Sequence, residues 1–159
     1  MTHLLEGEKA PAFSGPDQNG NTISNNNFKG EKTALYFYPH DNTPTCTIQA
    51  CNLRDNFAAL KKEGIQVIGV STDDEKSHTK FIKKYKLPFP LIADKDHAIA
   101  KKFGVWAPKK FMGREFLGMN RTTFLIDEKG IIKKIIHKPK SRMHAQEIGD
   151  DWKEILTTS

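Results

Sequence analysis

The 159-residue sequence has no apolar run approaching the ~20 residues that a helix needs to cross a bilayer. Its opening residues, MTHLLEGEKAPAF, also lack the apolar stretch of about 7–15 residues that is typical of a signal peptide. We therefore expect no membrane partner and no export, and we expect a cytoplasmic protein. Internal repeats, low-complexity tracts and linkers are missing too, which predicts a single domain over residues 1–159.

A dense basic tract is also missing, although the chain carries 25 Lys and Arg against 19 Asp and Glu, a net charge of +6. The basic residues come as scattered pairs, and no aromatic ladder is interleaved with them. This pattern favours solvated basic faces over nucleic-acid binding, and it leaves open the docking of an acidic protein partner. The pairs are Lys83-Lys84, Lys101-Lys102, Lys109-Lys110 and Lys133-Lys134.

Cysteine is scarce. The only two, Cys46 and Cys51, lie five positions apart in YPHDNTPTCTIQACNLRD, residues 38–55. This spacing is neither the C-x-x-C of a redox pair nor that of a common zinc knuckle. In a reducing compartment, paired cysteines are more often catalytic or metal-binding than permanently bonded. A structural disulfide, a metal site that includes His40, two inert thiols and a reactive pair are the four alternatives.

Short apolar runs separated by amphipathic segments predict an α/β protein. The first 30 residues, rich in Gly, Asn and Pro, suggest loops with a hairpin at Asn19-Gly20. Segment 131–138 fits a helix or a strand, and the preceding turn at 127–130 favours a strand. The other expected strands are 33–38, 65–71, 90–94 and 122–127, and the expected helices are 44–63, 74–86, 96–103 and 143–157.

The helix that carries both cysteines has a clear start. Thr43 is a suitable N-cap, and Pro44 suits the first helical position, where its missing N–H costs nothing. Cys46 is then the third helical residue, where free backbone amides and the positive end of the helix dipole favour the thiolate.

At about 100° per residue, Cys46 lies on the stripe of Leu53 and is expected to face the core, whereas Cys51 lies on the opposite side. The two are separated by about 7.5 Å along the axis and about 140° around it. Because a disulfide needs Cβ atoms about 3.5–4.5 Å apart, the helix must unwind near residues 45–51 before the two sulfurs can bond. Because the two thiols lie on opposite faces of the helix, they are also poorly placed to be ligands of one metal ion. We expect the histidines to lie at the surface.

The spacing Pro39-x-x-x-Thr43-x-x-Cys46 resembles the active-site motif of the peroxiredoxins, thiol peroxidases with a thioredoxin-like fold. The run at 38–55 and the segment GVWAPKKFMGREFLGMNRTTFLID, residues 104–127, resemble the peroxiredoxin Q or bacterioferritin comigratory protein subfamily. The resemblance implies a central mixed sheet flanked by helices, with an N-terminal hairpin extension. It also implies a monomer that needs no cofactor and no metal.

The resemblance further implies a reaction that reduces hydrogen peroxide and organic hydroperoxides. Cys46 would attack the peroxide and become a sulfenic acid, Cys51 would convert the sulfenic acid into an intramolecular disulfide, and a thioredoxin-type reductant would open it. A thiol–disulfide oxidoreductase and a non-enzymatic redox sensor are the competing functions. The first would favour a C-x-x-C motif, and the second would consume no peroxide.

The same resemblance assigns the surroundings of Cys46. Thr43 and Arg121 would orient and polarise the peroxide, Pro39 would shield it from water, and the backbone amides of Thr45 and Cys46 would be donors. Phe103 and Trp106 are expected to be wall or core residues.

Two positions depart from the subfamily pattern. Gln49 stands where Glu is usual, so it can accept a hydrogen bond from Arg121 but brings no charge. His40 stands where Lys is common, close enough in sequence to influence Cys46.

Overall fold

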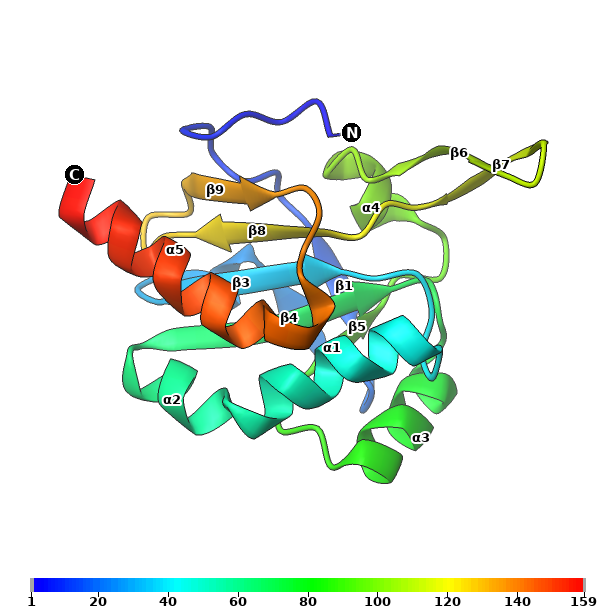
Figure 1. Cartoon of the computed structure of the whole chain (residues 1–159), viewed down its shortest axis with the longest axis horizontal. Coiled ribbons are helices and arrows are strands. Elements are labelled where there is room, and N and C mark those ends of the chain that lie inside the picture. The colour runs from blue at the N-terminus through cyan, green and yellow to red at the C-terminus, as the bar shows by residue number, and fades with distance from the viewer. Residues whose placement is uncertain (1, 159) are drawn as a thin grey trace.

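The computed structural model describes residues 2–158 and is built on a mixed five-stranded sheet with the order β5-β4-β3-β8-β9 (Figure 1). Strands β3, β4 and β5 are parallel, and β8 and β9 add to the β3 edge in antiparallel fashion. This order confirms the expected central mixed sheet. The sheet strands are β3 (Lys32–Phe37), β4 (Ile65–Ser71), β5 (Leu91–Ala93), β8 (Thr122–Ile126) and β9 (Ile132–Ile136).

The central strand β3 is apolar because both of its faces are covered. Leu35 and Phe37 belong to one buried cluster, and Ala34 and Tyr36 belong to the other. Successive side chains of a strand point to opposite faces, so this alternation places a separate core on each side of the sheet.

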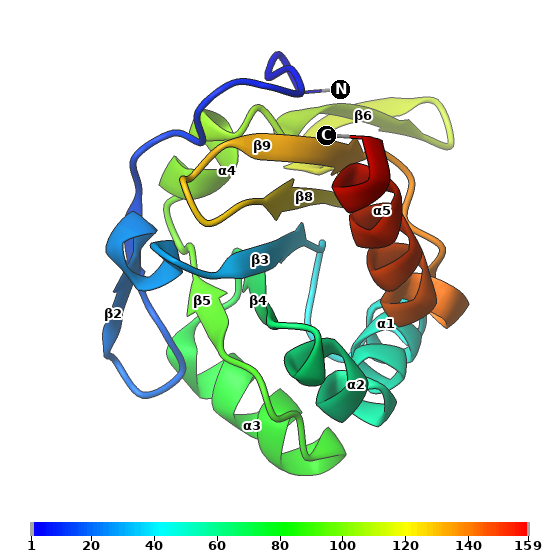
Figure 2. The ribbon, with the colours of Figure 1, turned by 90° about the vertical axis from the view of Figure 1, so that its left-hand side faces the viewer.

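Helices cover one face of the sheet, and the N-terminal segment with one short helix covers the other (Figure 2). The first layer contains α1 (Pro44–Asp55), α2 (Phe57–Lys62), α3 (Glu75–Tyr85) and α5 (His144–Thr158). The second contains α4 (Ala98–Lys102), with Phe103 fully buried behind it, as expected of a core residue. Short 3-10 turns at Asn25–Phe28 and Ser141–Met143 complete the helical elements.

The expected N-terminal hairpin is confirmed. Strands β1 (Ser14–Pro16) and β2 (Thr22–Ser24) pair antiparallel around a loop that contains Gly20. The Asp17 carboxylate accepts the backbone N–H groups of Asn19 and Asn21 at 2.8 and 2.9 Å, which fixes the loop.

The prediction of a single helix over 44–63 is wrong in one respect, because the structure has two helices there, separated at Asn56. The Asn56 side-chain amide donates to the carbonyl of Asn52 at 2.9 Å, and its backbone lies at φ −112° and ψ 9°. Asparagine side chains compete with the backbone for such bonds, which explains the break between α1 and α2. The helix end at Gly64 is as expected.

A hairpin between α4 and β8 was not predicted from the sequence. Strands β6 (Trp106–Phe111) and β7 (Arg114–Met119) form a two-stranded sheet that projects from the body in Figure 1. The turn residues Met112 and Gly113 both have positive φ, 52° and 79°, as a tight two-residue hairpin turn requires. The hairpin ends just before Arg121 and β8.

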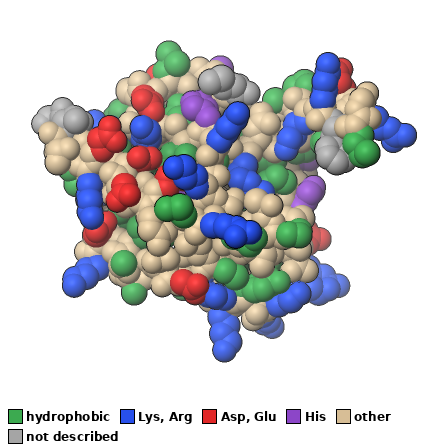
Figure 3. All heavy atoms as spheres, viewed as in Figure 1, with side chains coloured by type: hydrophobic (Ala, Val, Ile, Leu, Met, Phe, Trp, Pro, Cys, Tyr) green, Lys and Arg blue, Asp and Glu red, His purple; other side chains and the backbone are tan. Residues whose placement is uncertain are grey.

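The charge distribution over one face agrees with the scattered basic pairs of the sequence. In Figure 3, Lys and Arg side chains are spread over the surface, and Asp and Glu side chains gather on the side where α5 lies. Among the helices of residues 2–158, none combines the length and the apolar character that crossing a bilayer demands.

Candidate active site

Cys46 lies in the first turn of α1 and is almost completely buried, with 2% of its surface exposed. Thr43 occupies the N-cap position with an extended backbone, but its hydroxyl donates to the carbonyl of His40 at 3.2 Å instead of capping the helix. The first intrahelical bond runs from the Thr47 N–H to the Thr43 carbonyl at 2.8 Å. No side chain of the described residues therefore caps this helix end, which leaves the amides of the first turn as donors beside the sulfur.

Arg121 connects the sulfur to a second residue of α1. Its Nη2 lies 3.2 Å from the Cys46 Sγ, and its Nη1 donates to the Gln49 Oε1 at 2.6 Å. Arg121 precedes β8, which pairs directly with β3, so the sheet fixes the guanidinium opposite the helix. Three residues that the sequence analysis singled out are thus brought into one contact group.

Gln49 is fully buried, and its amide orientation follows from its neighbour. A guanidinium only donates hydrogen bonds, so the atom facing Arg121 must be the amide oxygen. The amide nitrogen is then turned away from Arg121, and among residues 2–158 it has no hydrogen-bond partner.

Cys51 lies in the same unbroken helix as Cys46, and both thiols are free. Cys46 is buried and Cys51 is half-buried, with Ile48, 38% exposed, one turn before it. This placement agrees with the expected separation of about 140° around the helix. In this conformation the two sulfurs cannot bond, because disulfide geometry needs a much closer approach.

The other candidates, Pro39, His40 and Thr45, lie around the start of α1. Within residues 2–158 their side chains form no hydrogen bond with Arg121. Thr45 is exposed and Pro39 is half-buried in the loop between β3 and α1. The exposed His40 ring has its Nδ1 3.7 Å from an Asp73 oxygen, and within the described residues it makes no hydrogen bond to Cys46.

A cavity of about 470 Å³ adjoins Arg121 on the side of the projecting hairpin. Its lining is largely basic, with Lys109, His137 and Lys138 around Arg121. The cavity gives the Arg121 side chain a path to solvent.

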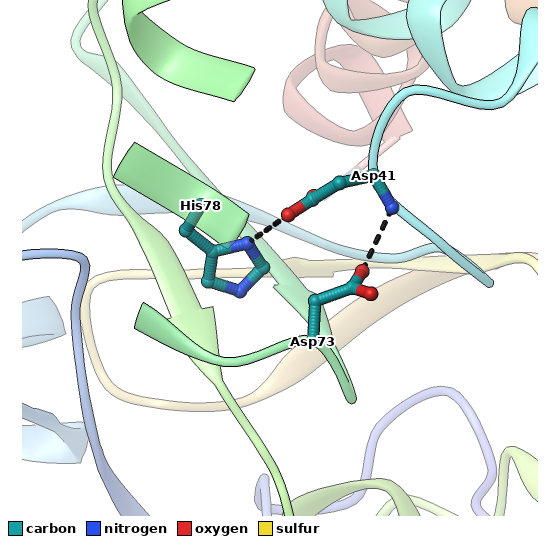
Figure 4. A group of neighbouring side chains, drawn as sticks. All are labelled: Asp41, Asp73 and His78. Carbon is teal, nitrogen blue, oxygen red and sulfur yellow. Dashed lines mark hydrogen bonds and ion pairs between the residues drawn. The ribbon is translucent and has the colours of Figure 1, made fainter. Parts of the chain in front are cut away.

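The loop before α1 is held by a buried network beneath it. Asp41 accepts hydrogen bonds from the Tyr38 hydroxyl at 2.6 Å and the Ser77 hydroxyl at 2.8 Å, and it lies 2.7 Å from the His78 Nδ1. Its own backbone N–H donates to Asp73 at 2.7 Å. Figure 4 shows the contacts of Asp41 with His78 and with Asp73. The network anchors the loop that carries Pro39 and Thr43 to α3 and to the end of β4.

Asp41, Asp73 and His78 place their potential ligand atoms within 4.8 Å of one another, close enough to suggest a metal site. The other His78 nitrogen lies 2.9 Å from the carbonyl oxygen of Ile92, and the Ser71 hydroxyl donates to Asp73 at 2.7 Å. Because these groups already satisfy one another, the cluster is best described as a hydrogen-bond network.

Two histidines contradict the expectation that these residues lie at the surface. His78 and His144 are both fully buried. His144 lies at the start of α5, with its Nδ1 2.8 Å from Glu147 and its Nε2 2.8 Å from the Thr123 hydroxyl. Each is buried because both ring nitrogens find a partner.

The His78 network predicts a pH-dependent stability. Burial lowers the pKa of His78, but the hydrogen bond and the charge of Asp41 more than offset this, so the pKa lies above its ordinary value of 6.5. A raised folded-state pKa means that the stabilisation is fully present below pH 6.5 and is lost as the pH rises through the folded value. His78→Gln should therefore cost about 3–5 kcal/mol in acidic solution and less in alkaline solution.

Urea unfolding of the wild type and of His78→Gln across this pH range measures that difference. The exposed residue His137 supplies the control, because His137→Gln removes no buried side chain and should leave the free energy of unfolding close to that of the wild type. A destabilisation by His78→Gln that grows with pH would contradict the assignment.

Comparison with known proteins agrees with this geometry. The AhpC/TSA family profile matches residues 7–135. The chain is 44% identical over 144 residues to peroxiredoxin Bcp of Escherichia coli, covering 91% of this chain and 92% of that protein. It is 41% identical over 141 residues to peroxiredoxin Bcp of Bacillus subtilis, covering 89% and 90%.

Solved structures extend the likeness to the fold. Peroxiredoxin Q of Xanthomonas campestris aligns with a TM-score of 0.84 at 31% identity, covering 89% of this chain and 90% of that one. PrxQ of Xylella fastidiosa aligns with a TM-score of 0.90 at 26% identity, covering 98% and 99%. These neighbours confirm the expected thioredoxin-like fold. The chain belongs to the AhpC/TSA family and, within it, to the Bcp or peroxiredoxin Q peroxiredoxins.

Proposed function

We propose that this thiol peroxidase works through Cys46, whose thiolate attacks a hydroperoxide. The observation that carries the proposal is the 3.2 Å contact between the Arg121 Nη2 and the Cys46 Sγ at an uncapped helix start. Sulfur donates an electron pair to the distal peroxide oxygen, the O–O bond breaks, and Cys46 becomes a sulfenic acid. The leaving alkoxide or hydroxide takes up a proton and departs as alcohol or water.

Stabilisation of the departing oxygen is the main task of the surrounding donors. An ordinary thiol of pKa about 8.5 is already a few per cent thiolate at neutral pH, so full ionisation gains little more than about 1.5 decades in rate. The remaining acceleration must come from donors aimed at the negative charge that grows on the leaving oxygen. Arg121 and the amides of Thr45 and Cys46 are suited to this role. The Thr43 hydroxyl donates to the His40 carbonyl in this structure, and it can join them once it turns away from that carbonyl.

The neighbouring residues complete the site. We assign Pro39 to shielding the sulfur from water and Gln49 to holding the Arg121 guanidinium in place through its amide oxygen. The cavity of about 470 Å³ is lined by Arg121 but not by Cys46. It offers space beside Arg121 for the organic part of a hydroperoxide. The site needs no cofactor or metal for this chemistry, because the sulfur supplies both electrons.

The positions of Cys46 and Cys51 on α1 determine how the sulfenic acid is converted into a disulfide. Once the helix unwinds between the cysteines, the Cys51 thiol attacks the Cys46 sulfenic acid, water leaves, and a disulfide forms. A thiol reductant completes the cycle, and we propose one of the thioredoxin type. We also propose that the whole chain acts as one domain, as a monomer, in the cytoplasm.

The experiment is peroxide consumption with the protein far below stoichiometry, in the presence of a thioredoxin system. We expect many turnovers, and intact mass after peroxide treatment should show the loss of two hydrogens with a Cys46–Cys51 link. Unlinked cysteines in the peroxide-treated protein would overturn the resolving mechanism. Reduction of insulin disulfides without peroxide consumption would point to the oxidoreductase alternative.

A further inference from the structure

Two buried hydrogen-bond donors beside Cys46 have no partner among residues 2–158. They are the amide nitrogen of Gln49 and the hydroxyl of Tyr36. Gln49 is 0% exposed and Tyr36 is 1% exposed. A buried polar group that finds no partner carries the full cost of its lost hydration, so such groups call for an explanation.

Both donors belong to the surroundings of the sulfur. Gln49 lies three residues after Cys46, on the same side of α1, and one guanidinium joins its amide oxygen to the Cys46 sulfur. Tyr36 lies on β3 beneath the helix, in the same buried cluster as Cys46. One donor thus comes from the helix that carries Cys46, and the other comes from the sheet strand in the same buried cluster.

Tyr36 keeps its proton under ordinary conditions. Burial raises the pKa of Tyr36 well above its usual value, and the negative charge of Cys46 raises it further. The hydroxyl is therefore available as a donor to an anion at that position.

We propose that the Gln49 amide nitrogen and the Tyr36 hydroxyl form a receiving site for oxygen bound to the Cys46 sulfur. The proposal rests on the proposed role of Cys46 and adds a function for the residue that departs from the subfamily pattern. A carboxylate in place of Gln49 would bring only acceptors, whereas the amide offers N–H donors as well. The donors without partners in the thiol state gain them when the sulfur carries oxygen.

The receiving site has a consequence for the fate of the enzyme. Hydrogen bonds to the oxidised sulfur stabilise the folded helix, and the helix must unwind before Cys51 can react. A sulfenate that stays folded can instead attack a second hydroperoxide. Its sulfur forms a second S–O bond as the O–O bond breaks, which yields a sulfinate and an alcohol, or water when the peroxide is hydrogen peroxide. This chain should therefore be readily over-oxidised.

The test uses the Cys51→Ser protein, in which resolution cannot compete. Excess hydrogen peroxide converts Cys46 to the sulfinate, and a mass gain of two oxygens on the Cys46 peptide confirms it. Thermal unfolding is then compared between the reduced and oxidised forms of each variant. Because each comparison is internal to one variant, a general destabilisation by the substitution cancels.

We expect oxidation to raise the melting temperature of the Cys51→Ser protein. Adding Gln49→Met or Tyr36→Phe should reduce that gain by about 2–4 °C each, the shift that one hydrogen bond produces in a domain of this size. Trp152→Phe is the matched control, because Trp152 Nε1 is another buried donor without a partner but lies in α5. It should leave the gain unchanged.

A second readout uses chains that retain Cys51. The sulfinate formed per catalytic turnover should fall about tenfold when Gln49→Glu removes the amide donor. An undiminished gain in melting temperature in both Gln49→Met and Tyr36→Phe would overturn the receiving site. No mass gain at Cys46 would instead refute the role of Cys46 itself.

Discussion

Replacing Arg121 with alanine should slow the reaction of the protein with hydrogen peroxide by about 10²–10³-fold, the loss typical of removing one preorganised oxyanion donor. Arg121 is the side chain that contacts the Cys46 sulfur, with its Nη2 at 3.2 Å. A guanidinium has five N–H donors, and two of its nitrogens are already oriented by the sulfur and by Gln49. The remaining N–H groups are therefore donors next to the sulfur, and we expect them to stabilise the departing peroxide oxygen.

The measurement is the second-order rate of Cys46 oxidation in single-turnover stopped flow. The thiolate fraction of each variant is obtained from the pH dependence of Cys46 alkylation. We expect the rate of Arg121→Ala to fall far more than its thiolate fraction, and Arg121→Lys to recover only part of the loss because Lys lacks the planar fork. Arg114→Ala, an exposed change on β7, should behave as the wild type. A loss of rate that only matches the loss of thiolate would show that Arg121 acts on ionisation alone.

The sheet and most helices could be predicted because their signals are local. The runs at 33–38 and 65–71 are nearly all apolar, and the structure places them as the neighbouring central strands β3 and β4. Segment 131–138 was ambiguous by periodicity, and its pairing with β8 settles it as a strand. The hairpin pairing thus confirms the strand that the preceding turn favoured over a helix.

The errors in the fold have identifiable causes. The break at Asn56 depends on one side-chain hydrogen bond to the Asn52 carbonyl, which competes with an otherwise continuous helical pattern. The strands of the β6–β7 hairpin are six residues each, as long as β3, but they lie outside the main sheet, with Phe116 and Leu117 open to solvent, so their sequence shows no clean alternation. Gly113, followed by the charged pair Arg114-Glu115, was a signal of its turn in the sequence.

The active site was predictable where helix geometry fixes it. The N-terminal position and the angular separation place Cys46 in the core and Cys51 on the other side of α1. The hydrogen bond from Arg121 to Gln49, which only the family resemblance suggested, is also present. The buried pairs of His78 and His144 were missed. Each histidine is separated in sequence from at least one of its partners, and only the folded chain brings Asp41 to His78 and Thr123 to His144.

Replacing Cys51 with serine should stop catalysis after about one peroxide per chain, because the sulfenic acid on Cys46 then lacks its thiol partner. The first oxidation should proceed at nearly the wild-type rate, since Cys51 is half-buried on the other side of the helix from the sulfur that reacts. Cys46→Ser supplies the contrast, because it should not react with the first peroxide either.

Stopped-flow kinetics with a thioredoxin system and intact mass analysis separate these outcomes. In Cys51→Ser the sulfenic acid should persist and advance to the sulfinic acid as peroxide increases, whereas the wild type should form the disulfide first. In the wild type, the ratio of disulfide to sulfinic acid depends on whether the first turns of α1 unwind before a second peroxide arrives. Unwinding can be fast enough because helix ends open more easily than the core. Full turnover of Cys51→Ser with thioredoxin would mean that the reductant reaches Cys46 directly, and unwinding of α1 would then have no place in the cycle.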